Sequence, residues 1–251
     1  MRVSRLYVDL PLALNGQVEL DDDSGHYVRT VLRLKKDDAV ILFNGNGGEY
    51  VCVLGEVSRK TVQVTVKSWN DRSVESPLSV ILGLGISRGD RMDLSVQKAV
   101  ELGANRITPL ITERCLVQFK GEKKPQRLLH WRKIVQHAAE QSGRTVLPEL
   151  TEVTTLQNWV SNQQGLKVFL DPYAEKSLAQ LQPDGMEVTL LTGPEGGFSD
   201  QERITAKAAG FIPVRLGSRI LRTETATIAA LAAVQMLWGD FGLRGQKTDD
   251  G

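Results

Sequence analysis

The chain has 251 residues, enough for one large domain or two modest ones. Its hydrophobic fraction of 41% and charged fraction of 24% are ordinary for a globular protein, and its formal net charge of +1 excludes a globally basic nucleic-acid binder. The N-terminus lacks the apolar core of a signal peptide, and the longest apolar helix, 226–238, is shorter than the roughly 20 residues that span a bilayer. We therefore expect a cytoplasmic protein, in which Cys52 and Cys115 are buried thiols and not a disulfide.

Residues 1–72 have the pattern of a small β-rich unit with a single helix. We expect four strands, at 5–9, 39–43, 49–56 and 61–67. The glycine- and asparagine-rich segment 44–48 predicts a tight hairpin turn, because its residues tolerate positive φ. The helix is expected at 26–34, with Ser24 as its N-cap.

Three side chains of this helix, His26, Arg29 and Arg33, are spaced to share one face. Two cations and an imidazole on one face could hold phosphates. The same spacing also suits an ordinary solvated helix face, so the pattern alone leaves both interpretations open.

The polar segment 70–77 is predicted to link this unit to a second one. The continuous apolar run 78–84 then indicates a strand buried on both faces of a parallel sheet. An amphipathic helix is expected at 90–102, closed by Gly103, and a further strand at 106–111.

Segment 112–144 is locally basic, with eight lysines and arginines against three glutamates. It is our candidate for a surface that faces a nucleic acid, and the alternative is an ordinary solvated loop and helix. His130 and His137 lie on its helix without further ligands at metal-binding spacing, so we expect no metal site.

Residues 190–227, with the apolar run that leads into them, organise the rest of the chain. Two apolar runs, 188–191 and 212–216, each open into a glycine-bearing loop, with a helix at 200–209 between them. This order predicts a parallel sheet, and ligands usually bind at the carboxyl ends of such strands. The two loops could therefore enclose one small molecule. The final helix, 226–238, is so apolar that it must be buried in the core or against another subunit.

Five motifs carry a resemblance to a known family, and they follow one another in the expected order. They are QKAVELGANRITPL at 97–110, TERC at 112–115, AAEQSGR at 138–144, GPEGGFS at 193–199 and LGSRILRTETA at 216–226. Together they resemble the SPOUT methyltransferases. More closely, the chain resembles the RsmE-type family, which methylates N3 of a uridine in the RNA of the small ribosomal subunit.

The resemblance implies an α/β fold with an N-terminal PUA-like β-barrel at 1–72 and a C-terminal trefoil-knot (SPOUT) methyltransferase domain at 73–242. The knot would lie in about 165–240, and the tail 243–251 would be disordered. The implied cofactor is S-adenosyl-L-methionine and the implied substrate is 16S rRNA in the small ribosomal subunit. The family pattern further favours a homodimer packed around the last helix.

The resemblance also implies roles for individual residues. Arg222 would stabilise the negative charge of a deprotonated uracil, while Glu195 and Glu224 would be bases or orienting groups, or simply ion-paired or helix-start carboxylates. The cofactor-binding candidates are Leu170, Thr192, Gly193, Gly196, Gly197, Leu216, Gly217, Ile220, Leu221 and Thr225. The RNA-binding candidates are Arg2, Arg5, His26, Arg29, Arg33, Arg88, Arg114, Lys123, Lys124 and Arg144.

Two other functions remain open on the sequence. A SPOUT enzyme of this kind could act on transfer RNA or on a ribose 2′-hydroxyl. The chain could also be a non-catalytic RNA-binding protein with a knotted fold, although two intact ligand loops favour an enzyme.

Overall fold

The computed structural model describes residues 3–116 and 123–242, without the side chains of residues 123 and 124. The chain divides into two compact units. The N-terminal unit comprises 1–75 together with 139–147, and the C-terminal unit comprises 76–138 and 148–251. Residues 139–147, the end of a long helix and the segment after it, therefore pack with the strands of the first unit although they lie far from them in sequence.

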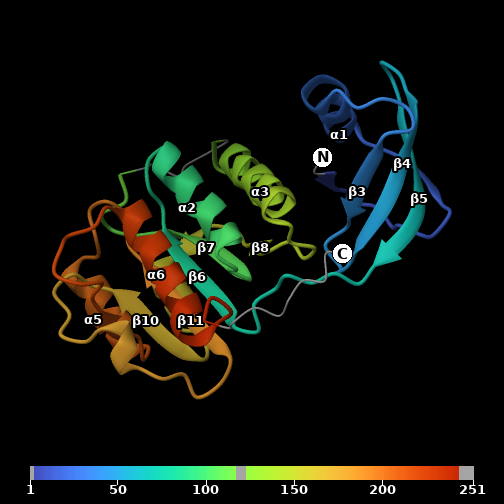
Figure 1. Cartoon of the computed structure of the whole chain (residues 1–251). Helices are drawn as coiled ribbons and strands as arrows, with labels where there is room; N and C mark the ends of the chain where they lie inside the picture. The colour runs from blue at the N-terminus through green and yellow to red at the C-terminus, as the bar shows by residue number, and fades with distance from the viewer. Residues whose placement is uncertain (1–2, 117–122, 243–251) are drawn as a thin grey trace. The chain divides into compact units, whose positions relative to one another are not determined.

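The N-terminal unit is built on a five-stranded sheet in the order β1-β3-β4-β5-β2 (Figure 1). Its strands are β1 (Ser4–Tyr7), β2 (Gln17–Glu19), β3 (Ala39–Phe43), β4 (Glu49–Val57) and β5 (Val62–Asn70). β1 runs parallel to β3, and the other pairs are antiparallel. The predicted hairpin joins β3 to β4, and three glycines of its turn have positive φ. The short strand β2 was not predicted.

The helical segment of this unit differs from the sequence prediction. α1 (Asp22–His26) starts earlier, because Asp21 caps it by accepting a hydrogen bond from the Ser24 backbone N–H at 2.7 Å. The predicted cap, Ser24, is itself inside the helix and buried. The chain then widens into a π-helical turn, η1 (Tyr27–Leu32), and ends at Arg33, which has a left-handed φ of 54°. The regular helical spacing that would align cations on one face is therefore not kept.

The C-terminal unit contains a parallel sheet in the order β12-β10-β11-β6-β7-β8, with β9 also paired to β7. Its strands are β6 (Ser79–Gly85), β7 (Arg106–Ile111), β8 (Glu149–Leu150), β9 (Thr154–Thr155), β10 (Leu166–Leu170), β11 (Glu187–Thr192) and β12 (Ile212–Val214). β6 and β11 are neighbours at the centre and almost entirely buried, as their continuous apolar sequences require. The predicted parallel sheet is confirmed.

In its described residues the C-terminal unit contains six helical segments. They are α2 (Asp90–Glu101), α3 (Lys123–Ser142), α4 (Leu156–Val160), η2 (Leu178–Gln180), α5 (Asp200–Ala208) and α6 (Thr223–Trp238). The last residues of α3 belong to the N-terminal unit. α2 and α6 lie side by side (Figure 1). Ile81 and Leu191 of the sheet pack with Trp159 of α4 and Ala206 of α5. None of the helices in the described residues combines the length and apolarity that a membrane crossing requires.

α6 begins at Thr223, three residues before the predicted start, because Arg222 has the extended backbone of an N-cap residue. The end of the second predicted loop is therefore the first turn of a helix. α6 buries a stripe that includes Leu231 and Val234, but Met236 and Leu237 are 58% and 43% exposed in the single chain. Its apolar sequence thus exceeds what the core of one chain covers.

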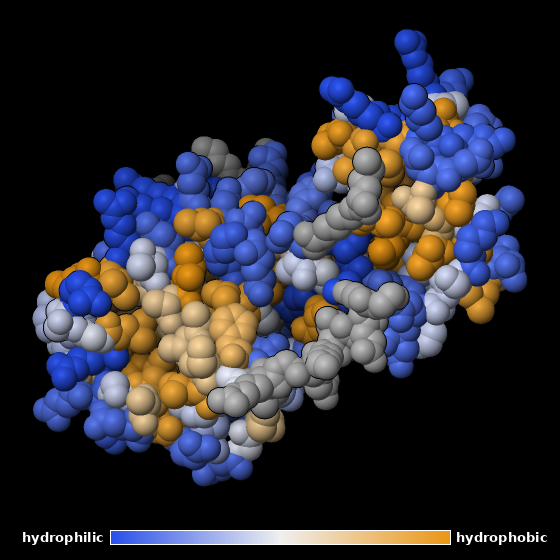
Figure 2. Space-filling view, in the orientation of Figure 1, coloured by the Kyte–Doolittle hydropathy of each residue, from blue (hydrophilic) through white to orange (hydrophobic). Residues whose placement is uncertain are grey.

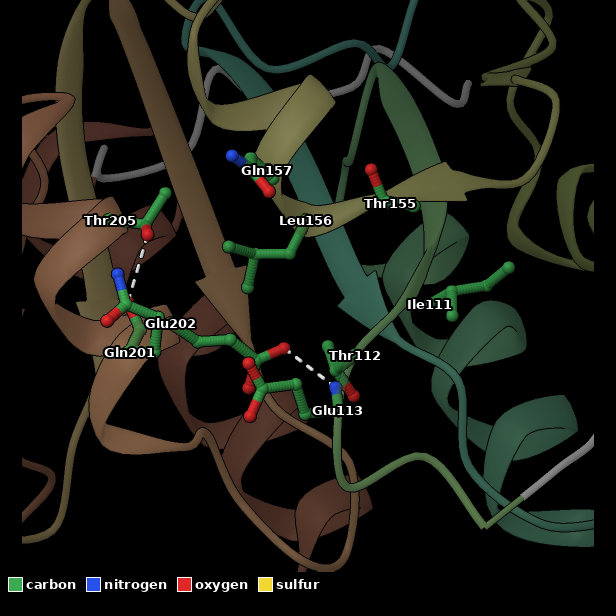
Figure 3. A pocket seen from close by; sticks show the side chains of 9 residues that line it. All are labelled: Ile111, Thr112, Glu113, Thr155, Leu156, Gln157, Gln201, Glu202 and Thr205. Atoms are coloured by element: carbon green, nitrogen blue, oxygen red, sulfur yellow. Dashed lines mark hydrogen bonds between the residues drawn. The ribbon is translucent and has the colours of Figure 1, made fainter.

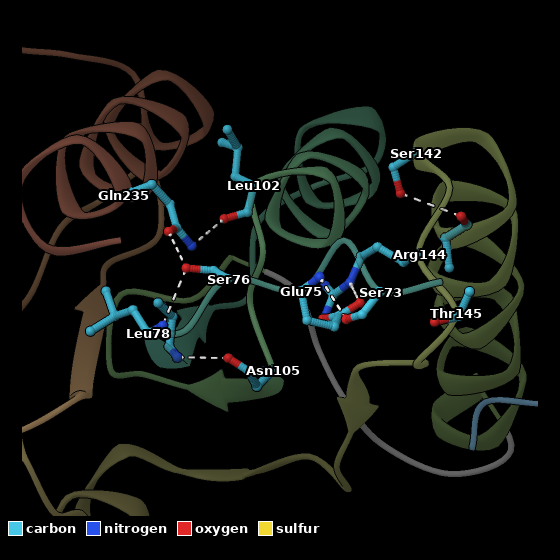
Figure 4. Close-up of polar contacts among 12 residues, drawn as sticks. Ser73, Glu75, Ser76, Leu78, Leu102, Asn105, Ser142, Arg144, Thr145 and Gln235 are labelled. Atoms are coloured by element: carbon cyan, nitrogen blue, oxygen red, sulfur yellow. Dashed lines mark hydrogen bonds and ion pairs between the residues drawn. The ribbon is translucent and has the colours of Figure 1, made fainter. Parts of the chain in front are cut away.

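The C-terminal end of α6 is attached to the sheet by a polar network near the amino ends of β6 and β7 (Figure 4). The Gln235 amide is buried; it accepts a hydrogen bond from Ser76 Oγ at 2.8 Å and donates one to the Leu102 carbonyl at 3.0 Å. Asn105 Oδ1 accepts from the Val80 N–H at 2.8 Å. This edge of the sheet is held by satisfied buried hydrogen bonds, which favours a structural role.

Candidate active site

Two glycine loops meet at the carboxyl ends of the strands. The first glycine loop, 193–199, follows β11, and the second glycine loop, 215–222, follows β12. The start of α6 joins them: Thr223 Oγ1 donates to the Gly193 carbonyl at 2.5 Å, and Thr227 Oγ1 lies 3.2 Å from Thr192 Oγ1. The helix that leaves the second loop is therefore fastened to the first.

The first glycine loop is packed so closely that it needs small residues. A Cβ on Gly85, at the end of β6, would lie 2.6 Å from the Pro194 nitrogen, and a Cβ on Gly196 would lie 2.9 Å from the Arg114 Cβ. Gly197 has a φ of +64° and open space around its Cβ position. The loop thus presses its backbone against its neighbours on one side and leaves an open surface at Gly197.

A cavity of about 540 Å³ lies between the two loops. Residues 193–198 and 220–224 form much of its wall, and Pro172 and Tyr173, which follow β10, contribute as well. Arg91, Arg114 and Arg203 complete the cationic part of the lining, together with Arg222 of the second loop. Two of these four arginines are ion-paired, Arg91 with Glu195 and Arg203 with Asp171.

The cavity brings together most of the predicted catalytic and cofactor-binding residues. Of the predicted cofactor residues, Gly193, Gly196, Gly197, Ile220 and Leu221 line it, as do the predicted catalytic residues Arg222, Glu195 and Glu224. The other cofactor candidates lie in the adjoining strand ends, second loop and first turn of α6, outside the lining: Leu170, Thr192, Leu216, Gly217 and Thr225. Ile220 is 78% exposed, so it forms an open rim and not a closed wall.

Glu195 is held as a carboxylate at the cavity wall. Its Oε1 accepts hydrogen bonds from the Arg88 backbone N–H at 3.0 Å and from Arg91 Nη1 at 3.2 Å. Burial would raise the pKa of Glu195, but these hydrogen bonds and the Arg91 charge outweigh it, so the pKa is lowered. Glu195 therefore stays ionised and is a weak base.

Two carboxylate oxygens in this cavity lack a hydrogen-bond donor. Within the described part of the chain, neither Oε2 of Glu195 nor Oε2 of Glu224 has a partner, although both atoms are buried. A buried acceptor without a donor is costly, and such atoms in a native fold need an explanation. Two of them on one cavity indicate a ligand that donates hydrogen bonds.

A second cavity, of about 260 Å³, provides a contrast (Figure 3). Its acidic residue Glu202 is buried but fully engaged: Oε1 accepts from the Glu113 N–H and Oε2 from the Ser199 N–H, both at 2.9 Å. Glu202 and Ser199 form the capping box that starts α5. This carboxylate is thus explained by the fold, whereas those of Glu195 and Glu224 are not.

Two of the predicted RNA-binding residues have structural roles. Arg5 is buried and ion-paired with Glu49, and Arg144, with 4% of its side chain exposed, is ion-paired with Glu75 (Figure 4). All four residues belong to the N-terminal unit. Since both guanidinium groups are engaged inside the protein, neither presents a surface to a phosphate.

The remaining predicted RNA-binding residues vary in exposure. His26, Arg33, Arg88 and Arg114 are exposed, and Arg29 is half-buried. Arg114 also donates to the Gly196 carbonyl at 3.2 Å, which makes it part of the cavity. Arg2 and the side chains of Lys123 and Lys124 lie outside the described residues.

The lining residues that sequence reasoning missed include three with long polar side chains, Arg91, Tyr173 and Arg203. Arg91 lies on α2, about a hundred residues before the glycine loops, and only the fold brings it to Glu195. Tyr173 follows β10, and the Asp-Pro pair just before it at a strand end was the available signal. In the described side chains, no group of three or more His, Cys, Asp or Glu residues could hold a metal ion.

Comparison with known proteins defines the class. The model of an RNA methyltransferase domain matches residues 74–235, and that of an RNA methyltransferase PUA domain matches residues 20–67. A Legionella pneumophila structure with SAM bound, described as a methyltransferase, has a TM-score of 0.93 at 38% identity and covers 96% of this chain and 100% of its own. The fold is therefore that of an RNA methyltransferase: an N-terminal PUA-like β-barrel and a C-terminal α/β trefoil-knot (SPOUT) domain.

Full-length relatives narrow the class. The ribosomal RNA small subunit methyltransferase E of Buchnera aphidicola subsp. Schizaphis graminum is 37% identical over 242 residues, which is 96% of this chain and 98% of the relative. The crystal structure of the Neisseria gonorrhoeae enzyme of the same name, bound to S-adenosyl methionine, has a TM-score of 0.89 at 35% identity and covers 96% of this chain and 100% of its own. The chain belongs to the ribosomal RNA small subunit methyltransferase E family. The limits of the two domains and the range of the knot stay predictions.

Proposed function

We propose that this enzyme transfers a methyl group from S-adenosyl-L-methionine to N3 of a specific uridine in 16S rRNA of the small ribosomal subunit. The observation that carries the proposal is the cavity between the glycine loops, with its arginines and its two unpartnered carboxylate oxygens. Family membership supports the substrate, because the relatives named above are small-subunit rRNA methyltransferases.

The residues of the cavity fit S-adenosyl-L-methionine. Gly193 and Gly197 line the cavity, with open space at the Cβ position of Gly197, and Ile220 and Leu221 add apolar surface for an adenine. The cofactor carries an ammonium group, an exocyclic amine and two ribose hydroxyls, which are the donors that Glu195 Oε2 lacks. When bound, it supplies an activated methyl group on a sulfonium sulfur.

The chain itself must handle the proton on N3 of uracil, since N3 is a poor nucleophile until that proton leaves. We assign this acceptor role to Glu224, whose buried Oε2 lacks a partner among the described residues. Glu195, with its lowered pKa and its tie to Arg91, is an orienting group. Arg222, exposed at the cavity, stabilises the negative charge that spreads over O2 and O4 of uracil.

The same proposal includes a homodimer formed through α6. Figure 2 shows apolar residues along α6, and the exposed side chains of Met236 and Leu237 lie at its end. Apolar side chains that stay exposed together on one helix favour a protein partner. Leu237→Arg should convert a dimer to monomers in light scattering; a monomeric wild-type chain would refute this part. Because the substrate is the ribosomal subunit, the enzyme would work in the cytoplasm.

The test is transfer of label from S-adenosyl-L-methionine to three substrates: small subunits that lack the modification, the same RNA without protein, and bulk transfer RNA. Digestion and mass spectrometry then identify the modified nucleoside. N3-methyluridine from the subunits would support the proposal. Label only in transfer RNA, or on a ribose, would keep the methyltransferase but overturn its substrate. No label, with measurable cofactor binding, would favour a non-catalytic RNA-binding protein.

A further inference from the structure

An aromatic side chain at the mouth of the cavity is mostly exposed to solvent. Tyr173 lines the cavity and yet is 74% exposed. An aromatic residue this exposed contributes little to the core, and its place on the cavity lining makes the ring accessible to a ligand.

The backbone of Tyr173 is held in place by hydrogen bonds to the end of the sheet. Its N–H donates to Asp171 Oδ1 at 3.0 Å, and Asp171 is buried at the end of β10, where its own N–H donates to the Val214 carbonyl at 2.9 Å. The tyrosine is therefore attached to two neighbouring strands of the sheet, and its loop is not free to turn away.

The ring of Tyr173 is also supported by a cation. The Arg203 guanidinium, on α5, lies 5.5 Å from the ring centroid, and its Nη1 donates to Asp171 Oδ2 at 3.1 Å. One buried carboxylate thus positions both the ring and the guanidinium behind it. A ring supported in this way, with most of its surface open, is a pre-arranged stacking platform.

We propose that Tyr173 is the surface on which the target uracil stacks once it has left the RNA. The inference rests on the proposed methyl transfer to a uracil. A base taken out of the RNA loses its stacking, and an aromatic side chain restores it. The exposed position at the rim suits a substrate that arrives from outside, whereas the loop backbone lies deeper. Asp171 and Arg203 are positioning residues for this platform.

The experiment compares Tyr173→Leu, Tyr173→Ala and Tyr173→Phe in the full-length enzyme. It measures kcat and KM for small subunits, and the Kd for S-adenosylhomocysteine. Leucine and alanine should lower kcat/KM for the subunit by about 5- to 150-fold, which corresponds to about 1–3 kcal/mol of base–aromatic stacking, mostly through KM. Phenylalanine should stay within about 2-fold of wild type, and the Kd for the cofactor product should be unchanged in all three.

Two further variants sharpen the test. Arg203→Met should raise KM by a smaller factor than Tyr173→Leu with kcat retained, because it removes only the support behind the ring. Ile204→Ala is the matched control and should behave as wild type. Ile204 follows Arg203 in the sequence, is 59% exposed and lines neither cavity.

The outcomes separate this inference from the proposed function. If wild-type enzyme does not methylate small subunits, the proposed function fails first. If wild type is active and Tyr173→Leu is equally active, the platform is refuted. A loss of cofactor-product affinity in Tyr173→Leu, with KM for the subunit unchanged, would assign the ring to the adenine of the cofactor and overturn the inference.

Discussion

The two ends of the parallel sheet in the C-terminal unit treat buried polar groups in opposite ways. At the amino ends of β6 and β7, the buried amide of Gln235 is matched on both its oxygen and its nitrogen, by Ser76 and by Leu102. At the carboxyl ends, buried oxygens of Glu195 and Glu224 have no donor in the described part of the chain. One end of α6 belongs to the first environment and its other end to the second.

This difference separates stability from function within one helix. A polar network with hydrogen-bond partners inside the protein fixes α6 on the sheet, and stabilisation of the fold is enough to explain it. The unsatisfied oxygens are a cost that folding alone does not explain, and a bound ligand would remove it. We call the side of the sheet at the carboxyl ends of its strands the carboxyl edge, and the side at their amino ends the amino edge. We expect substitutions at the carboxyl edge to change binding and turnover, and substitutions at the amino edge to change stability.

The largest effect should follow from filling the carboxyl edge. Gly197→Val places a β-branched side chain in the cavity at a φ of +64°, so S-adenosyl-L-methionine binding should fall below detection by calorimetry. Gly47→Val is the matched control: Gly47 has a φ of +87° and open space too, but it lies in the β3–β4 hairpin. Both variants should lose stability, and only Gly197→Val should lose the cofactor. Normal binding by Gly197→Val would remove the first glycine loop from the site.

Removal of the cation beside the reacting base should have the next largest effect. Arg222→Ala should lower kcat by about 10²–10³-fold with an unchanged cofactor Kd, the usual range for one electrostatic stabiliser. Its side chain makes no capping hydrogen bond to α6, so folding should be preserved. Arg219→Ala, an exposed arginine of the same loop outside the cavity lining, should keep wild-type turnover. An equal loss in both variants would mean that loop charge in general, and not Arg222, is responsible.

The carboxyl edge was largely predictable from the sequence, because its signals are local. Glycine runs directly after apolar strands identify both loops. Elsewhere in the fold, local signals also give the bounds of the strands 39–43 and 106–111 as the structure has them. What could not be predicted depends on distant partners. Arg5 and Arg144 have the composition of RNA-binding residues, but glutamates 44 and 69 positions away bury them in ion pairs. The short elements β2, β8, β9 and α4 carry too few residues for a periodic pattern.

The amino edge should respond through stability alone. Gln235→Ala leaves the Leu102 carbonyl without its donor and should lower the free energy of unfolding by about 1–3 kcal/mol. Denaturant unfolding measures the loss, with Gln182→Ala at an exposed position as the control expected to change little. Cofactor Kd and kcat should match wild type for both variants. A loss of cofactor affinity in Gln235→Ala with unfolding unchanged would contradict the division between the two edges.

The smallest effect should be a dependence of stability on pH. Because the folded-state pKa of Glu195 is lowered, its contribution to stability is fully present above its unfolded-state pKa and is lost as the pH falls through the folded value. The contribution should be below about 1 kcal/mol, since its partner Arg91 is half exposed. Unfolding curves of wild type and Glu195→Gln should therefore differ most at neutral pH and converge in acid. Arg91→Met, which removes one donor and keeps the Arg88 N–H, should show part of the same convergence, whereas curves that stay parallel down to low pH would mean that the carboxylate of Glu195 gains nothing from these hydrogen bonds.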